Sequence, residues 1–162
     1  MKYKKLLSLN DLNQVTRTLK LKSSSNKIVF TNGCFDIIHA GHVQYLEDAK
    51  QLGDILIVAV NSDESIQRIK GTSRPIICQE HRISVLNALN MIDYLIMFDT
   101  DTPIPIIESI QPDIHVKGGD YTEDELPEST IIREYGGSIK ILPLVPDLST
   151  SKIIEKIIKI SQ

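Results

Sequence analysis

The sequence predicts an α/β protein with a five-stranded parallel sheet and helices on both of its faces. Short apolar, partly β-branched segments recur five times, at 27–30, 55–60, 94–98, 113–117 and 139–142. Helical patterns lie between them, and strands that alternate with helices form parallel sheets. The segment 55–60, Ile-Leu-Ile-Val-Ala-Val, is apolar throughout, which is typical of a central strand that is buried on both faces.

The helical stretches precede the first strand, connect the strands and follow the last one. Asn10 or Asp11 is expected to cap the first of them, and Pro103 and Pro105 lie early in the fifth, where proline is tolerated. The expected helices cover 10–22, the residues up to 52, a short stretch around 66–69, 80–89, the residues after 103, 128–135 and the residues after 148.

Composition indicates one globular domain, 1–162, made of an N-terminal helix and connector (1–26) and an α/β core (27–162). The chain is 41% hydrophobic and 24% charged, and its net charge of −3 gives no footprint for nucleic acid or an anionic membrane. It has no apolar run of about 18 residues and no signal-peptide pattern. Cys34 and Cys78 form neither a metal spacing nor a disulfide framework. We therefore expect a cytoplasmic protein.

The most informative stretch is 31–42, Thr-Asn-Gly-Cys-Phe-Asp-Ile-Ile-His-Ala-Gly-His, which passes from the first strand into a helix. Free backbone N–H groups at the start of a helix bind phosphate. Gly33 and Gly41 allow close approach of a ligand, and His39 and His42 add hydrogen-bond donors. A nucleotide should bind here, although the two histidines could instead cap the helix, lie in the core or ligate a metal.

Three further polar segments follow predicted strands or open the last helix, at 61–63, 117–120 and 148–151. In parallel sheets, ligands bind beyond the carboxyl ends of the strands, near the point where the strand order switches. All four segments are expected at that edge.

These residues resemble a known superfamily. Gly33-Cys34-Phe35-Asp36, His39-Ala40-Gly41-His42 and Ser149-Thr150-Ser151 are similar to the motifs of the cytidylyltransferase-like nucleotidyltransferases. The resemblance implies their Rossmann-like fold. The segments 31–42, 58–63, 70–75 and 116–121 most resemble D-glycero-β-D-manno-heptose 1-phosphate adenylyltransferases, which also occur as the C-terminal half of a bifunctional kinase–adenylyltransferase. Some cytidylyltransferases have an arginine before the last motif, and 144–147 contain none.

The resemblance implies transfer of an adenylyl group from ATP to a sugar 1-phosphate, giving ADP-heptose for lipopolysaccharide or surface polysaccharide, and pyrophosphate. ATP and the sugar phosphate would be the partners, together with a second copy of the chain in a homodimer. Mg²⁺ is expected on the phosphates, because no carboxylate cluster indicates a metal site held by protein. One alternative is a cytidylyltransferase acting on glycerol 3-phosphate or a similar alcohol phosphate, and another is a non-catalytic nucleotide-binding regulatory module.

The same resemblance assigns residues to roles. The catalytic residues would be His39, His42, Lys70 and Arg82. The nucleotide would be bound by Thr31, Asn32, Gly33, Cys34, Phe35, Gly41, Lys117, Gly118, Ser149, Thr150 and Ser151. The sugar phosphate would be bound by Asp36, Asp63, Arg74, Gly119 and Asp120.

Several of these residues also have a structural alternative. Arg82 would otherwise be solvated on an exposed helix face, Asp63 would cap a helix, and 118–119 would serve only a tight turn. Lys70 and Arg74 would be cations of a solvated loop. Ser149 and Thr150 can cap the last helix and bind phosphate at once, and Cys34 is expected to be small and buried.

Overall fold

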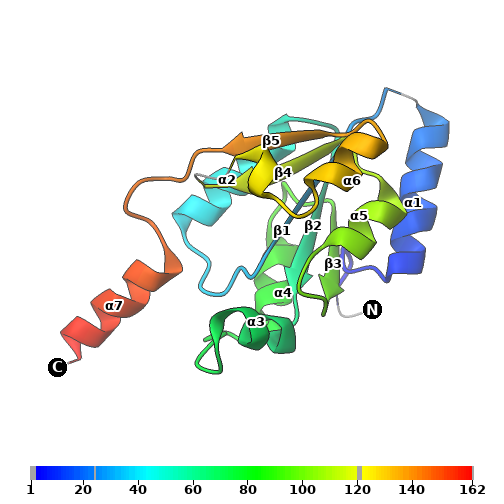
Figure 1. Ribbon diagram of the computed structural model, residues 1–162. Helices are drawn as coiled ribbons and strands as arrows, with labels where there is room; N and C mark the ends of the chain where they lie inside the picture. Colours follow the sequence, from blue (N-terminus) through cyan, green and yellow to red (C-terminus); the bar gives the residue numbers. More distant parts are fainter. Residues whose placement is uncertain (1–2, 24, 120–121, 162) are drawn as a thin grey trace.

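The fold is built on one parallel sheet, in a computed structural model that describes residues 3–23, 25–119 and 122–161. The strands are β1 (Ile28–Gly33), β2 (Ile55–Asn61), β3 (Tyr94–Phe98), β4 (Ile114–Gly118) and β5 (Ser138–Leu142). They pair in the order β3-β2-β1-β4-β5, all parallel (Figure 1). Ile28 is in register with Ile55, and Val29 with Ile114. The predicted five-stranded parallel sheet is confirmed.

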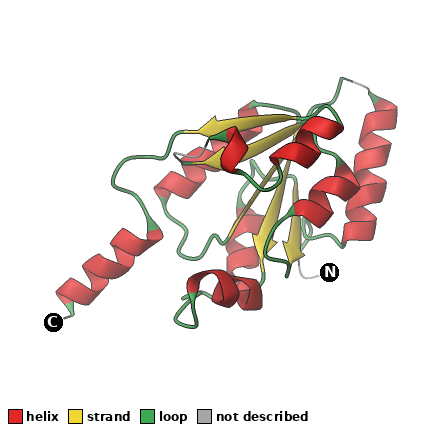
Figure 2. Cartoon of the chain, viewed as in Figure 1, coloured by secondary structure: helices red, strands yellow, loops and turns green. Residues whose placement is uncertain are grey.

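Helices cover both faces of the sheet, as Figure 2 shows. They are α1 (Leu9–Lys22), α2 (Ala40–Gln51), α3 (Asp63–Lys70), α4 (Gln79–Ala88), α5 (Ile104–Ile110), α6 (Ser129–Glu134) and α7 (Thr150–Ile160), with a 3₁₀ turn η1 (Glu123–Glu125). Apolar side chains of α1, α5 and α6 form one core with β1 and β2, and those of α2 and α4 form a second core on the opposite face. Burial of these two cores stabilises the sheet from both sides.

Two details differ from the sequence prediction. The first helix is capped by Ser8, whose Oγ accepts a hydrogen bond from the Asp11 N–H, so capping by Asn10 or Asp11 was wrong. The first strand continues to Gly33 instead of ending at Phe30, because it pairs with β2 over its whole length. The first residues of the motif are therefore held in the sheet.

Helix α7 differs from the others because it extends away from the body of the molecule (Figure 1). None of its residues is buried, and the side chains of Ile157, Ile158 and Ile160 are exposed. Only its first turn lines the cavity described below. Among the described residues, no helix has the length and apolar character needed to cross a membrane.

Candidate functional site

A cavity of about 520 Å³ lies at the carboxyl ends of β1 and β4, where the strand order switches. Asn32 and Gly33 of β1 and Lys117 and Gly118 of β4 form its sheet side. The start of α2, the loop after α3 and the start of α7 complete its wall. The predicted location at the switch point is confirmed, because all four predicted segments contribute residues to the lining of this cavity. The segment 61–63 contributes Asn61 alone.

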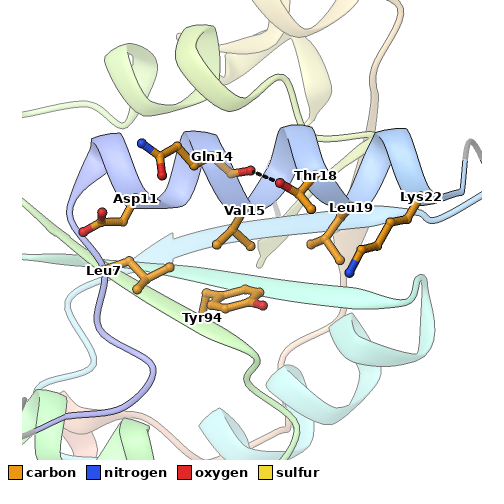
Figure 3. A pocket seen from close by; sticks show the side chains of 8 residues that line it. All are labelled: Leu7, Asp11, Gln14, Val15, Thr18, Leu19, Lys22 and Tyr94. Atoms are coloured by element: carbon orange, nitrogen blue, oxygen red, sulfur yellow. Dashed lines mark hydrogen bonds between the residues drawn. The ribbon is translucent and has the colours of Figure 1, made fainter.

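A second hollow of about 520 Å³ lies between α1 and β3, on another side of the molecule (Figure 3). Its lining is Leu7, Asp11, Gln14, Val15, Thr18, Leu19, Lys22 and Tyr94. None of the predicted site residues is among them. Size therefore does not distinguish the two hollows, but their chemistry does.

The two histidines of the motif stand together at the start of α2. His39 is at the N-cap position and His42 is in the first turn, and the centroids of their rings are 3.9 Å apart. A Cβ atom on Gly41 would lie 3.1 Å from the His39 ring, so glycine permits this arrangement. The His39 side chain makes no capping hydrogen bond, which makes the helix-capping alternative wrong.

Both rings have unused hydrogen-bonding capacity. The Nδ1 atoms of His39 and His42 are buried and have no hydrogen-bond partner within the part of the chain that the structure describes. Burial, followed by the charges of His39 and Lys70, lowers the pKa of His42 to about 4. The imidazole of His42 is therefore neutral at pH 7, and an anion in the cavity would favour its protonation.

Asp36 acts within the protein instead of facing a ligand with free oxygens. The residue is 3% exposed, and its carboxylate lies 2.7 Å from Nε of Arg74 and accepts hydrogen bonds from the N–H groups of Ile76 and Ile77. Burial acts to raise its pKa, but the two amides and Arg74 outweigh it and leave the pKa lowered. Asp36 thus fixes the segment that carries Arg74 beside the cavity, and because Asp36 also lines the cavity, its contact with the sugar phosphate stays a prediction.

The structure places Arg82 inside the protein, away from its predicted catalytic position. It is 0% exposed and does not line the cavity. Its guanidinium donates to the carbonyls of Ile77 (3.1 Å), Cys34 (2.5 Å) and Asn61 (2.8 Å), and to a carboxylate oxygen of Asp63 (2.8 Å). Burial makes the solvated surface position wrong, and because four of the five N–H donors are used by the protein, this geometry gives no support to a contact with the triphosphate. Arg82 joins the motif, the end of β2 and the segment before α4.

Asp63, a predicted substrate contact, is likewise paired with groups of the protein. One oxygen of its carboxylate accepts from Arg82 and the other from the Gln79 N–H, and the residue does not line the cavity. The helix cap at this position is Ser62, whose Oγ accepts from the Ser65 N–H. Asp63 therefore connects the start of α3 to the start of α4, and its place outside the cavity lining gives no support to the predicted contact with sugar or ribose.

Tyr45, a lining residue that the sequence did not indicate, links helix α2 to the two strands beneath the cavity. Its hydroxyl is 2.7 Å from Oγ1 of Thr31 and donates to the carbonyl of Val116 at 3.0 Å, so it joins α2 to β1 and β4. A Cβ on Gly118 would lie 3.2 Å from the Tyr45 ring. Thr31 is fully buried below the cavity, which corrects its assignment as a nucleotide contact.

Lys117 reaches the cavity from the end of β4. Its Nζ donates to Oδ1 of Asn32 at 2.9 Å and lies 3.2 Å from a carboxylate oxygen of Glu128. Both Lys117 and Asn32 line the cavity. An ammonium group here presents positive charge and a hydrogen-bond donor to whatever fills the cavity.

The last motif closes the opposite wall. Ser149 caps α7, with its Oγ accepting from the Lys152 N–H at 3.1 Å, and Thr150 donates to the carbonyl of Ile37 at 3.3 Å. Ser149, Thr150 and Ser151 all line the cavity. The capping role is thus present, and the same residues border the cavity at the start of the helix.

The cavity collects most, but not all, of the predicted residues. Those that line it are Asn32, Gly33, Cys34, Phe35, Asp36, His39, Gly41, His42, Lys70, Arg74, Lys117, Gly118, Ser149, Thr150 and Ser151. Those that do not are Thr31, Asp63, Arg82 and Gly119. Asp120 lies outside the described residues. Cys34 is only half-buried, not enclosed in the core as expected.

Sequence reasoning did not single out seven lining residues, namely Tyr45, Asn61, Ile69, Asp101, Leu144, Val145 and Leu148. Asn61 and Leu148 lie within predicted segments, which was the available signal. Ile69 and Asp101 have no pattern that separates them from ordinary surface residues.

The carboxylates of the cavity do not fit a metal site held by protein. Asp36 and Asp101 line it, and each forms an ion pair with an arginine, Arg74 and Arg68 respectively. Within 3–23, 25–119 and 122–161, no group of three or more His, Cys, Asp or Glu residues is placed to hold a metal ion. This geometry also gives no support to the alternative that His39 and His42 are metal ligands.

Comparison with known proteins agrees with the geometry. The family model described as Cytidylyltransferase-like matches residues 30–156. The bifunctional protein HldE of Alcanivorax borkumensis is 54% identical over 136 residues, and that of Syntrophotalea carbinolica is 46% identical over 151. The matches cover 84% and 93% of this chain but only 29% and 30% of those relatives. The chain thus spans less than a third of their length.

Solved structures show the same fold. The lipopolysaccharide core biosynthesis protein from Thermoplasma volcanium superposes with a TM-score of 0.61 at 31% identity, over 74% of this chain and 97% of that one. Pantothenate synthetase from Thermus thermophilus gives a TM-score of 0.64 at 12% identity, over 92% of this chain and 67% of that one. The latter likeness concerns the fold alone.

Proposed function

The chain belongs to the cytidylyltransferase-like family of nucleotidyltransferases, and on that basis we propose that it transfers an adenylyl group from ATP to D-glycero-β-D-manno-heptose 1-phosphate. The products would be ADP-heptose and pyrophosphate. The observation that carries the proposal is the pair of adjacent histidines, His39 and His42, at the start of a helix that borders the cavity. The similarity to a lipopolysaccharide core biosynthesis protein supports the choice of sugar.

The reaction is an in-line displacement at phosphorus. An oxygen of the sugar phosphate forms a bond to the α-phosphorus of ATP, the bond from that phosphorus to the β-phosphate oxygen breaks, and pyrophosphate leaves with the electron pair. Positioning and electrostatic stabilisation supply most of the rate in such reactions. His39 and His42 would donate hydrogen bonds to phosphate oxygens as negative charge develops on them.

The cations of the cavity wall would hold the charged ends of the substrates. Lys70 is the last residue of α3 and Arg74 lies in the loop after it, where both suit the pyrophosphate or the sugar phosphate. Ser149 and Thr150, with the N–H groups of the first turn of α7, would bind the β- and γ-phosphates. Lys117 and Asn32, on the sheet side, would meet the nucleotide.

Mg²⁺ would reduce the charge of the triphosphate, with ligands supplied by the phosphates themselves. Among the described residues, the two carboxylates that line the cavity are each paired with arginine, so no protein-held site is proposed. Every catalytic contribution described above comes from side chains and backbone N–H groups of this chain.

The deciding experiment measures pyrophosphate release with Mg²⁺ while ATP and CTP are crossed with heptose 1-phosphate, glycerol 3-phosphate and ethanolamine phosphate. Turnover only with ATP and the heptose phosphate is the expected result. Turnover with CTP and an alcohol phosphate would support the location of the site but contradict the proposed substrates. Nucleotide binding without pyrophosphate release in any pairing would favour a regulatory module.

A further inference from the structure

A buried carboxylate lies behind the cavity and belongs to none of the roles assigned so far. Glu128, the N-cap residue of α6, is 1% exposed. One oxygen of its carboxylate lies 2.9 Å from Nε2 of His115 and 3.2 Å from Nζ of Lys117. Burying a carboxylate is unfavourable unless it is paired and hydrogen-bonded. The pairing therefore explains how Glu128 can be held inside the protein.

The two partners of Glu128 come from one face of one strand. His115 and Lys117 are two residues apart on β4, so their side chains project to the same side of the sheet. The His115 ring is fully buried and stacks on Phe30 with the ring centroids 5.6 Å apart. Phe30 thus packs against the face of the His115 ring, and Glu128 binds the ring through Nε2. The two contacts fix the orientation of the ring.

The charges of this group are settled by its surroundings. Burial acts to raise the pKa of Glu128, but the hydrogen bond with His115 and the charge of Lys117 lower it to about 2, so the carboxylate is ionised. Burial lowers the pKa of His115, which leaves that ring neutral. Glu128 thus offers a full negative charge to Lys117 and a hydrogen-bond acceptor to the N–H of His115.

Lys117 is the member of the group that reaches the cavity. Its side chain is 20% exposed, and its ammonium group has three N–H donors. Within the part of the chain that the structure describes, Asn32 and Glu128 are its acceptors. Lysine side chains are flexible, so two fixed acceptors restrict where the ammonium group stands and leave a donor for a ligand.

We propose that Glu128 is a positioning residue for the nucleotide site, which acts by holding the Lys117 ammonium group against the sheet side of the cavity. Glu128 itself does not line the cavity, so it acts only through Lys117. This inference rests on the proposed function in one respect, namely that Lys117 contacts the nucleotide.

The test is a double-mutant cycle on the full chain with Glu128→Gln, Lys117→Met and the double variant. Glutamine keeps the shape of the side chain and removes its charge. The exposed residue Glu134 lies on the same helix, so Glu134→Gln is the matched control. Calorimetry with ATP and Mg²⁺ gives the affinity for the nucleotide.

Glu128→Gln should weaken nucleotide binding about tenfold, as expected for loss of a charged interaction that positions a ligand group. In the Lys117→Met background the same change should have no further effect on affinity. Lys117→Met alone leaves the buried carboxylate without its cation, so adding Glu128→Gln should raise the melting temperature. Equal loss of affinity with and without Lys117 would overturn the proposal.

A second readout needs no nucleotide. Lysines are methylated reductively with ¹³C, and the signal lost in Lys117→Met identifies Lys117. Glu128→Gln should shift and narrow that signal, whereas Glu134→Gln should leave it unchanged. An unchanged signal in Glu128→Gln would overturn the proposal. If the chain bound no nucleotide, the proposed function would fail while this signal still tested the link between Glu128 and Lys117.

Discussion

Replacing Arg82 by methionine should destabilise the fold without removing a ligand contact. Methionine keeps much of the length of the side chain but none of its donors, so three carbonyl oxygens and the carboxylate of Asp63 lose their partner. Breaking a buried ion pair by removing one partner costs about 3–5 kcal/mol. For a domain of this size about 1 kcal/mol corresponds to roughly 3 °C, so the melting temperature should fall by about 9–15 °C.

Thermal unfolding followed by calorimetry or circular dichroism measures this effect. Arg133→Met is the matched control, because Arg133 pairs with Glu123 and Asp124 at the surface and its side chain is 52% exposed. Such pairs contribute about 1 kcal/mol or less. Nucleotide affinity is then compared well below both melting temperatures. Equal melting temperatures for the two variants, with affinity lost only in Arg82→Met, would refute the reasoning and make Arg82 a ligand contact.

Three further predictions concern the motif. His42→Ala should lower turnover far more than it weakens ATP binding, and equal losses in steady-state kinetics and calorimetry would make His42 a binding residue only. Because the pKa of free His42 is about 4 and bound phosphate favours the imidazolium form, nucleotide binding should take up protons and tighten as the pH falls from about 7 to 5. Calorimetry with saturating Mg²⁺ in buffers of different ionisation enthalpy measures this uptake, and an identical signal in His42→Ala would assign it elsewhere. Asp36→Asn should release the segment 74–77 and raise the KM of the substrate held by Arg74. Since folding lowers the pKa of Asp36 from 3.8, its charge contributes stability that is complete above about pH 4 and is lost as the pH falls through the folded-state pKa, so acid unfolding should be less steep in Asp36→Asn. An unchanged KM together with an unchanged acid profile would contradict the proposed role of Asp36.

The position of the site was predictable because it depends on short-range patterns. Short clusters of apolar, partly β-branched residues mark each strand, each motif follows a strand or opens a helix, and parallel strands bring their carboxyl ends to one edge. The pairing of particular side chains was not predictable in this way. Asp36 and Arg74 are distant in the sequence, and only the path of the loop between them brings their charges together.

Arg82 shows that a usable signal was present. It lies four residues before Leu86, and both side chains are buried on one face of α4. The spacing therefore placed the arginine on the apolar face, although residue type alone favoured solvent. His115 and Lys117 have the corresponding signal in a strand, since a spacing of two indicates a shared face. Glu128 had none, because its partners lie on β4 and its burial depends on how η1 and α6 fold back.

The central position of β1 has a consequence for the order in which the protein assembles. On one side of β1, Ile28 pairs with Ile55 of β2. On the other side, Val29 pairs with Ile114 of β4, which lies much further along the chain. Contacts of such long sequence separation are slow to form, because the intervening chain must first be ordered. A nascent chain whose residues 114–118 are still inside the ribosome already contains the histidines of the motif. In that chain β1 can pair with β2 but not yet with β4. The cavity therefore cannot be complete before β4 has paired with β1, and fragments that end before β4 should bind no nucleotide.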